Sequence, residues 1–207
     1  MATRAETGTD TRRANDRRVR RTKQAIHDAV QTLLQETPYE KLTITAVARE
    51  ADIDRKTFYL HYESLDDVID EAVQDDVERI IGVWNDGVRD QSQTQDVTET
   101  FARICALLVQ ELTQQSQMLA NLGTDVLLSR IEGPLAAAIE REDALGVATA
   151  LGSRLPYSVS FFCGGLLAVL RRWVQEDDAL ALDEVGDVVS QLITSGVLGV
   201  LQDPQPA

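Results

Sequence analysis

Residues 42–62 read LTITAVAREADIDRKTFYLHY and contain two short segments of helical character joined by residues 50–53. Thr43 precedes the first segment and Asp54 the second, and both residue types commonly cap helix N-termini. Small Ala48 and Ala51 at the junction let the two backbones approach closely. Three apolar side chains can form a core between the segments: Val47, Ile53 and Phe58. Two helices too short to be stable alone, joined by a tight turn, are typical of a helix-turn-helix.

The second segment carries side chains suited to reading DNA. Arg55 and Lys56 lie in its first turn, where base edges are usually met, and either can donate to guanine O6 and N7. Thr57 can donate, accept or touch a thymine methyl group. Tyr59 and His61 are donors suited to phosphate oxygens at the groove wall, and the N–H groups at both helix N-termini favour phosphate as well. The sequence therefore predicts a helix that enters the major groove.

This segment resembles the N-terminal domain of TetR-family regulators. The family pattern runs Thr-x-x-x-(Ile/Val)-Ala-x-x-Ala-Gly-Val-Ser-x-x-Thr-(Phe/Leu)-Tyr-x-(His/Tyr)-Phe and is followed by a long helix. The residues in register with it are Thr43, Val47, Ala48, Ala51, Ile53, Thr57, Phe58, Tyr59 and His61. The resemblance covers about residues 17–84 and implies a DNA-binding transcription regulator, with repression as the expected role.

The segment departs from the family pattern at four places. Asp52 replaces the usual turn glycine, and Asp tolerates a left-handed backbone better than most residues. Asp54 replaces Ser as a cap and brings negative charge close to DNA. Tyr62 stands where Phe is common. Leu65 stands where a phosphate-binding Lys is frequent, and two aspartates follow it, so backbone binding should be weaker by about one contact.

Charge is distributed unevenly along the 207 residues, whose formal net charge is −14. Residues 1–65 hold 12 Lys and Arg against 10 Asp and Glu, whereas residues 66–207 hold 8 against 24. Because surface fields are screened within about 8 Å at physiological salt, local charge matters more than the total. An acidic body could reject non-specific DNA contact away from the reading head. The alternative is an acid-rich proteome or a salty cytoplasm.

Residues 1–16 lack periodicity, and we expect them to form a flexible basic arm. Residues 12–23 are rich in Arg and Lys and could reach a minor groove or flanking phosphates. The alternative is a solvated tail followed by an ordinary charged helix face. The predicted DNA contacts are Thr43, Arg55, Lys56, Thr57, Tyr59 and His61, with Arg20 and Lys23 from the preceding helix.

The whole chain reads as all-α, with about nine helices and no segment of period two. After the arm we expect a three-helix DNA-binding domain over residues 17–65 and a helical effector-binding and dimerisation domain over residues 66–207. Ser64 and Asp67 resemble a capping box before a long helix that runs to Trp84. Further helices are expected over 97–112, over 118–131 with a stop at Gly133-Pro134, from Pro156 to about 174, and over 185–200.

The resemblance also implies a ligand pocket in the second domain and a homodimer. The residues that could line a pocket for an unknown small-molecule effector are Trp84, Phe101, Met118, Leu122, Tyr157, Phe161 and Phe162; the alternative is that they are plain core. The last two helices are apolar on more than one face and contain glycines, which favours a four-helix bundle between two subunits. Its predicted residues are Gly164, Gly165, Val169, Trp173, Val189, Ile193, Gly196 and Val200, with burial inside one chain as the alternative.

Other classes of function find little support. The only histidines are His27, expected at the surface or near phosphate, and His61, so we predict no metal site, no cofactor and no enzyme. Cys105 and Cys163 lie in apolar helical patterns and are expected to be buried thiols. No secretory signal is visible, and the apolar stretch 157–170 is shorter than the ~20 residues of a membrane span, which predicts a soluble cytoplasmic protein. The rival hypothesis is a TetR-like protein that acts through a protein partner, with weak autonomous DNA binding.

Overall fold

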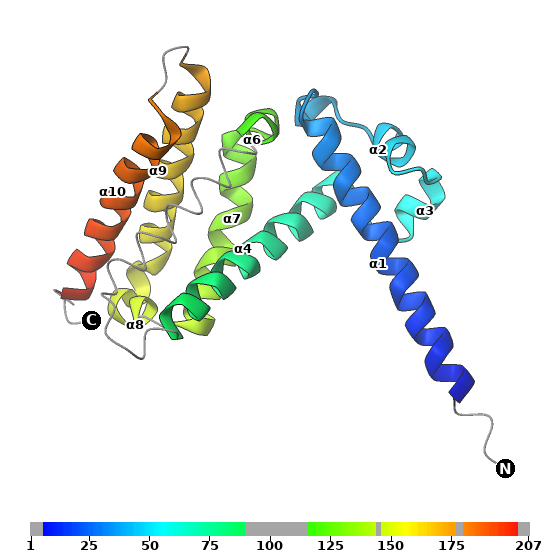
Figure 1. The fold of residues 1–207 in the computed structure, drawn as a ribbon, viewed down its shortest axis with the longest axis horizontal. Coiled ribbons are helices and arrows are strands. Elements are labelled where there is room, and N and C mark those ends of the chain that lie inside the picture. The colour runs from blue at the N-terminus through cyan, green and yellow to red at the C-terminus, as the bar shows by residue number, and fades with distance from the viewer. Residues whose placement is uncertain (1–5, 90–115, 144–145, 177–179, 203–207) are drawn as a thin grey trace. The chain divides into compact units, whose positions relative to one another are not determined.

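The computed structural model describes residues 6–89, 116–143, 146–176 and 180–202, and all regular structure in these ranges is helical (Figure 1). The chain divides into two compact units, residues 1–72 and residues 73–207, which we call the N-terminal and C-terminal units. The division falls inside one long helix, α4 (Leu65–Arg89), beyond the predicted boundary at 65/66. The all-α prediction is confirmed over the described residues.

The N-terminal unit contains α1 (Glu6–Leu34), the short 3-10 helix η1 (Tyr39–Lys41), α2 (Ile44–Glu50), α3 (Arg55–Tyr59) and the first turns of α4. Because α1 begins at Glu6, the prediction of a flexible arm is wrong for residues 6–16. No proline interrupts residues 6–34, and arginine, which is frequent over residues 12–21, favours helix. A helix can therefore extend beyond the apolar stripe that marks its packed part.

The core of the N-terminal unit is built by α1 and by the helices that pack on it. Phe58 and Val47 are fully buried, which confirms two members of the predicted small core, while Ile53 is half-buried. The other buried side chains of this unit are Ile26, Ala29, Val30, Leu34, Leu42, Ala48, Tyr62, Val68 and Ile69. The apolar face of α1 at 3- and 4-residue spacing thus supports α2 and α3, which are too short to be stable by themselves.

The C-terminal unit contains α6 (Ser116–Leu122), α7 (Thr124–Glu142), α8 (Val147–Leu151), the 3-10 helix η2 (Gly152–Arg154), α9 (Leu155–Gln175) and α10 (Leu182–Gln202), besides the rest of α4. The predicted helix that stops at Gly133-Pro134 is wrong. The break lies at Gly123, whose φ of 89° suits glycine, and Pro134 lies inside α7. Pro134 removes one helical hydrogen bond, but Ile131, Leu135 and Ile139 pack on the same apolar cluster and keep α7 continuous.

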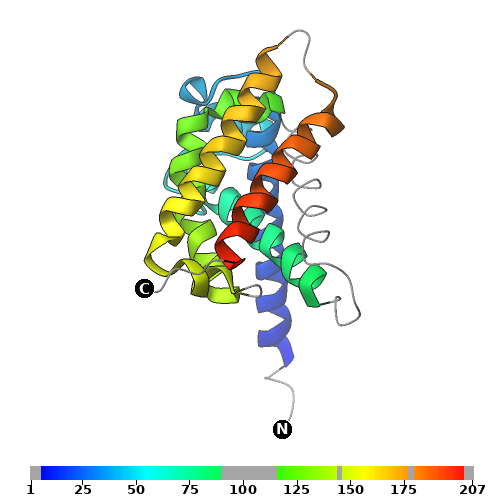
Figure 2. The same ribbon diagram turned by 90° about the vertical axis from the view of Figure 1, so that its left-hand side faces the viewer.

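Two apolar clusters hold the last helices together. In one, Leu151, Leu155, Val159 and Cys163 are buried against α7. In the other, Val185 and Val189 of α10 pack against Leu166, Val169 and Trp173 of α9. The two helices run side by side in Figures 1 and 2. Burial, with the nearby Glu132 carboxylate, raises the pKa of the Cys163 thiol to about 11, so this cysteine stays protonated as a small buried side chain. Cys105 and the predicted helix over 97–112 lie outside the described residues.

One stretch, Val147–Trp173, is long and apolar enough to cross a membrane by length and composition. It extends well beyond the 157–170 segment considered from sequence. η2 interrupts the α-helix within it at Gly152–Arg154. The buried residues of α9 in this stretch pack against other helices of the same unit, which gives their apolar character a role inside the fold.

Candidate nucleic-acid interface

The turn between α2 and α3 is fixed by local hydrogen bonds. Thr43 caps α2, because its side-chain oxygen accepts from the N–H of Ala46 at 3.2 Å. At the other end of α2 the N–H of Ile53 donates to the carbonyl of Ala48 at 2.9 Å, and that of Asp52 donates to Arg49 at 3.2 Å. This pair of bonds is the Schellman arrangement. Asp52 has the positive φ, 53°, that the arrangement needs, so the predicted turn survives without glycine.

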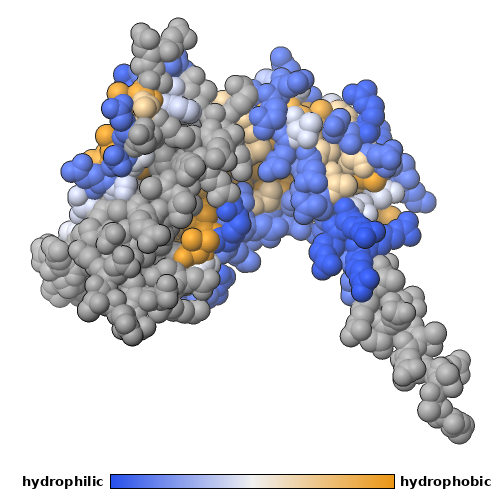
Figure 3. Space-filling model, in the orientation of Figure 1, coloured by the Kyte–Doolittle hydropathy of each residue, from blue (hydrophilic) through white to orange (hydrophobic). Residues whose placement is uncertain are grey.

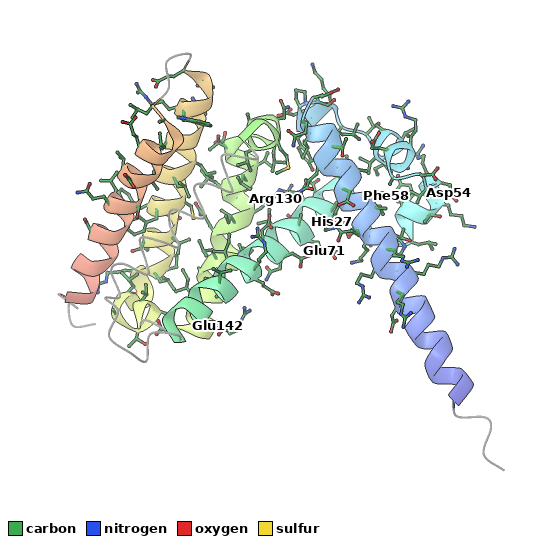
Figure 4. The ribbon with its side chains drawn as sticks, viewed as in Figure 1. His27, Asp54, Phe58, Glu71, Arg130 and Glu142 are labelled. Carbon is green, nitrogen blue, oxygen red and sulfur yellow. The ribbon has the colours of Figure 1, made fainter. Side chains whose placement is uncertain are left out.

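Asp54 anchors the start of α3. Its carboxylate accepts from the backbone N–H of Thr57 at 2.7 Å and from the Thr57 hydroxyl at 3.2 Å. These bonds, the backbone one foremost, lower the pKa of Asp54, and nearby Lys56 adds to the effect. The predicted cap is confirmed. Figure 4 shows Asp54 at the tip of α3 and Phe58 on the side of α3 toward α1.

The opposite side of α3 is exposed and carries the predicted DNA-reading groups. Arg55, Lys56 and Tyr59 are all exposed, and Thr57 and His61 are half-buried beside them. The Arg55 guanidinium lies 6.0 Å from the Tyr59 ring centroid, with Nη2 3.5 Å from the Tyr59 hydroxyl, so two predicted contact residues come together. Thr43 is exposed at the α2 N-terminus and Arg20 on α1.

Leu60 was not singled out from sequence, although 73% of its surface is exposed directly after α3. Its one signal was its place between two predicted contact residues, Tyr59 and His61. An exposed leucine there offers an apolar surface that could meet a thymine methyl group. Over the described N-terminal unit, Figure 3 otherwise shows a largely hydrophilic face with small apolar patches.

Lys23 does not belong to this exposed set. Its ammonium lies 2.6 Å and 2.9 Å from the two carboxylate oxygens of Glu71 on α4, and 5.0 Å from the Tyr62 ring centroid. Both side chains of the ion pair are about one-third exposed. Part of the Lys23 charge is thus already balanced inside the unit, which weakens the case for Lys23 as a DNA contact. Helical spacing does not indicate a partner 48 residues away.

His27 also turns inward. Its Nε2 lies 2.8 Å from the Tyr62 hydroxyl, and its ring is 5.9 Å from the Tyr62 ring. His27 is half-buried, so its ring lies partly at the surface and partly against Tyr62. Partial burial alone would raise the pKa of Glu71, but hydrogen bonds from Lys23 and Tyr62, with the charges of Lys23 and His27, lower it. Figure 4 shows His27 and Glu71 on the adjoining stretches of α1 and α4.

The acidic residues at the start of α4 have partners within the unit. Asp67 accepts from the backbone N–H groups of Glu63 and Ser64 at 2.8 and 2.9 Å, and the Ser64 hydroxyl accepts from the Asp67 N–H at 3.2 Å. The predicted capping box is confirmed. Asp66 accepts from the Tyr39 hydroxyl at 2.6 Å. Both carboxylates therefore serve local structure, and they still add negative charge to this end of the unit.

The residues proposed for an effector pocket separate into three groups. Leu122 is buried and Met118 and Phe162 are half-buried. Tyr157 and Phe161 are 79% and 76% exposed on α9, so the prediction that they line a pocket is wrong. Phe101 and the side chain of Trp84 lie outside the described residues. The error arises because α9 is apolar on two faces, and periodicity alone does not say which face turns inward.

Several residues predicted for the dimer interface pack between helices of one chain. Val169, Trp173 and Val189 pack between α9 and α10 of one chain, and the Trp173 indole donates to the carbonyl of Leu180 at 2.9 Å. Gly196 serves the same contact, since a Cβ there would lie 2.8 Å from Phe162 Cζ. Gly164 is half-buried and Gly165 exposed, while the side chains of Ile193 and Val200 lie outside the described residues.

A different set of α9 and α10 residues forms the exposed apolar face. It consists of Tyr157 and Phe161 on α9 and Val188 and Leu192 on α10, which we call the α9–α10 outer face. The last two are 48% and 64% exposed. On each helix the two exposed apolar side chains lie at 4-residue spacing, and large exposed apolar side chains often mark an interface. Elsewhere, the part of the chain that the structure describes holds no group of three or more His, Cys, Asp or Glu placed to bind a metal.

Comparison with known proteins agrees with this geometry. Residues 26–72, which span the packed part of α1 through the first turns of α4, match the model of the "Bacterial regulatory proteins, tetR family". No curated protein sequence matches the chain.

Solved structures show the same fold over most of the chain. The fatty acid degradation regulator FadR from Bacillus halodurans is 20% identical with a TM-score of 0.61, covering 84% of this chain and 95% of that one. A TetR transcriptional regulator from Streptococcus agalactiae is 20% identical, with a TM-score of 0.57 and coverage of 87% and 97%. FadR from Bacillus subtilis, in complex with stearoyl-CoA, is 17% identical, with a TM-score of 0.58 and coverage of 84% and 98%.

Proposed function

We propose that this chain, a member of the tetR family of bacterial regulatory proteins by its N-terminal domain, binds double-stranded DNA as a homodimer and represses transcription. The observation that carries the proposal is the exposed side of α3, where Arg55, Lys56 and Tyr59 stand free of the core while Phe58 on the opposite side is fully buried. A short helix anchored by one face and basic on the other is built to enter a major groove.

The two cations would have different tasks in the groove. The Arg55 guanidinium lies beside the Tyr59 ring, and a planar guanidinium suits two parallel bonds to guanine O6 and N7. Lys56 carries a flexible point charge that suits either a base edge or a phosphate oxygen. The free N–H groups at the starts of α2 and α3 would hold phosphates, with Thr43, His61 and Arg20 beside them.

Homodimerisation is proposed through the α9–α10 outer face. A palindromic site needs two reading heads about 34–36 Å apart, so the two-fold axis must lie in another part of the molecule. Tyr157, Phe161, Val188 and Leu192 are large, apolar and exposed, and a two-fold contact between two such faces makes a four-helix bundle. This face takes the place of the residues first predicted for the interface.

Regulation by a small apolar molecule is the next part of the proposal. The chain shares its fold with a FadR that was solved with stearoyl-CoA, and Met118 and Leu122 of α6 remain candidates to meet an apolar ligand. Since α4 runs from the N-terminal unit into the C-terminal unit, a ligand that favours one position of this helix would change DNA affinity. The change is set by the ligand's differential binding energy, typically about 1–3 kcal/mol.

A second candidate function is regulation through a protein partner, with weak autonomous DNA binding. The observation in its favour is charge, because residues 16–72 hold 9 Lys and Arg against 12 Asp and Glu, and Lys23 is already paired. The salt dependence of the binding affinity distinguishes the two functions. DNA binding must weaken steeply as salt rises, whereas an apolar protein contact does not.

The test is a fluorescence-anisotropy titration of the full chain against DNA upstream of its own gene and against random duplex, at two salt concentrations. The reading variant is Arg55→Ala/Lys56→Ala. Its matched control is Arg79→Ala/Arg141→Ala, which removes the same charge from two exposed ion pairs in the C-terminal unit. We expect salt-sensitive binding that is lost only in the reading variant. Equal binding of upstream and random DNA by the wild-type chain would reject autoregulation at that site.

A further inference from the structure

Tyr62 lies where three parts of the N-terminal unit meet. Its ring is buried, 5.9 Å from Phe58 of α3 and 5.9 Å from His27 of α1. Its hydroxyl is 2.8 Å from His27 Nε2, and it hydrogen-bonds the Glu71 carboxylate of α4, which Lys23 of α1 holds from its other side. These four polar residues, Lys23, His27, Tyr62 and Glu71, form a network that we call the polar clamp.

The donors and acceptors of the polar clamp have a consistent direction. Glu71 is a carboxylate and only accepts, so both Lys23 and the Tyr62 hydroxyl donate to it. With its proton committed to Glu71, the Tyr62 oxygen accepts from His27, whose Nε2 must then carry a proton. Every member therefore has a partner, and removing one leaves a half-buried polar group unsatisfied.

The polar clamp lies directly after the C-terminal end of α3 and ties that end to two other helices. At its start, α3 is held by the Asp54 cap and by the turn from α2. At its end, the chain turns through His61 and Tyr62, whose N–H groups bond back to Phe58 at 2.9 and 3.1 Å. A helix of five residues has little stiffness of its own beyond these attachments, so its direction depends on where both ends are held.

A phenylalanine at position 62 would fill the same space but would make no hydrogen bond to α1 or α4. The ring contacts with Phe58 and His27 need no hydroxyl, whereas both polar links to His27 and Glu71 do. The ring thus supplies packing, and the hydroxyl supplies a directional link between the end of α3 and two other helices.

We propose that Tyr62 is a positioning residue for DNA binding, whose hydroxyl links His27 to Glu71 and holds α3 in the direction from which Arg55 and Lys56 reach the bases. The inference rests on the proposed function. It assigns to three residues of the polar clamp, Tyr62, His27 and Glu71, a role in DNA affinity without contact to DNA.

The experiment compares substitutions that remove a single polar group from the full chain. Tyr62→Phe removes the hydroxyl, His27→Leu removes its donor partner, and His27→Gln keeps a side-chain N–H that can donate to Tyr62. The matched control is Tyr39→Phe, because the Tyr39 hydroxyl also donates to a carboxylate of α4, Asp66, but at an exposed site away from the polar clamp. The probe is a duplex that the wild-type chain selects from a random-sequence library. Binding is measured by anisotropy, and circular dichroism melts verify that each variant is folded at the assay temperature.

We expect Tyr62→Phe and His27→Leu, each fully folded, to bind at least about fivefold more weakly, the lower end of common coupling effects. His27→Gln and Tyr39→Phe should stay within about twofold of the wild type, and Tyr62→Phe/His27→Leu should bind no more weakly than Tyr62→Phe alone, because both changes break one link.

Two results would overturn the inference. One is a Tyr62→Phe affinity within about twofold of the wild type, and the other is additive losses in the double variant. If Tyr62→Phe does not fold, the DNA affinities of His27→Leu and His27→Gln are compared instead. Equal affinities of these two variants would overturn the inference. Failure of the wild-type chain to select any duplex would instead overturn the proposed function, before any variant is compared.

Discussion

The full burial of Phe58 predicts that its removal will strongly destabilise the N-terminal unit and leave the stability of the C-terminal unit unchanged. Phe58 has no exposed surface, and its ring contacts Tyr59 edge-on at 5.8 Å and Tyr62 at 5.9 Å. Truncation of a fully buried phenylalanine to alanine costs about 3–5 kcal/mol, from lost transfer energy and from the cavity left behind.

That cost is large beside the stability of the unit. At about 0.05–0.15 kcal/mol per residue, a unit that ends at Ala72 has roughly 4–11 kcal/mol in total. Phe58→Ala should therefore remove about a quarter of the stability or more, whereas Phe58→Leu, which keeps most of the volume, should cost less than about 1.5 kcal/mol.

Hydrogen exchange followed by mass spectrometry measures the two units separately within the full chain. We expect Phe58→Ala to lose amide protection in α1, α2 and α3 and to lose DNA binding, with unchanged protection in α9 and α10. Phe161→Ala is the matched control, because the same truncation on α9, outside the N-terminal unit, should leave α1 to α3 protected. Unchanged protection of α2 and α3 in Phe58→Ala would refute the reasoning, and so would an equal loss in both units.

Three further predictions address the dimer, the turn and the polar clamp. Phe161→Asp/Leu192→Asp should weaken dimerisation at least about 100-fold in analytical ultracentrifugation. Each buried apolar side chain contributes about 1.5–3 kcal/mol and occurs twice in a symmetric dimer. An unchanged dimer would reject the α9–α10 outer face as the dimer interface. Asp52→Gly should raise the free energy of unfolding by about 0.5–1 kcal/mol in urea titrations, since glycine adopts the φ of 53° without strain; a loss of stability would show that the Asp52 side chain matters more than its backbone. The pKa of Glu71 is lowered from its ordinary value of 4.5, so its contribution to stability should be complete above that pH and should fade as pH falls through the lower folded value. Glu71→Gln should flatten this acid dependence in urea midpoints measured from pH 3 to 6, and an identical slope in both proteins would contradict the assignment.

Sequence alone was sufficient to predict those local structures that depend on residues a few positions apart. The caps at Thr43 and Asp54 and the capping box at Ser64 and Asp67 involve partners three or four residues apart, which spacing reveals directly. The same holds for the turn at Asp52, whose hydrogen bonds close within five residues. The all-α class and the exposed reading side of α3 follow from these short-range signals.

Sequence was not sufficient where contacts with residues far along the chain determine the position of a side chain or the end of a helix. Lys23 and His27 looked like solvent-facing residues of a basic helix, and only the folded unit brings them to Glu71 and Tyr62, 48 and 35 residues away. Pro134 looked like a helix boundary because its local cost is visible in sequence, whereas the apolar cluster that keeps α7 continuous is not.

The interface residues show a third kind of ambiguity. α9 and α10 are apolar on two faces, and spacing defines the faces without saying which one packs inside the chain. Trp173 lies on the inner face and Phe161 on the outer one, although the sequence favours neither assignment.

The measurement that tests the central claim most directly is the salt-dependent DNA affinity of the wild-type chain beside Arg55→Ala/Lys56→Ala. The proposed function predicts binding that falls steeply with salt in the wild type, is lost in this variant and is kept in Arg79→Ala/Arg141→Ala. Binding that is insensitive to salt, or equal in the wild type and the reading variant, would contradict α3 as the element that holds DNA and would favour regulation through a protein partner.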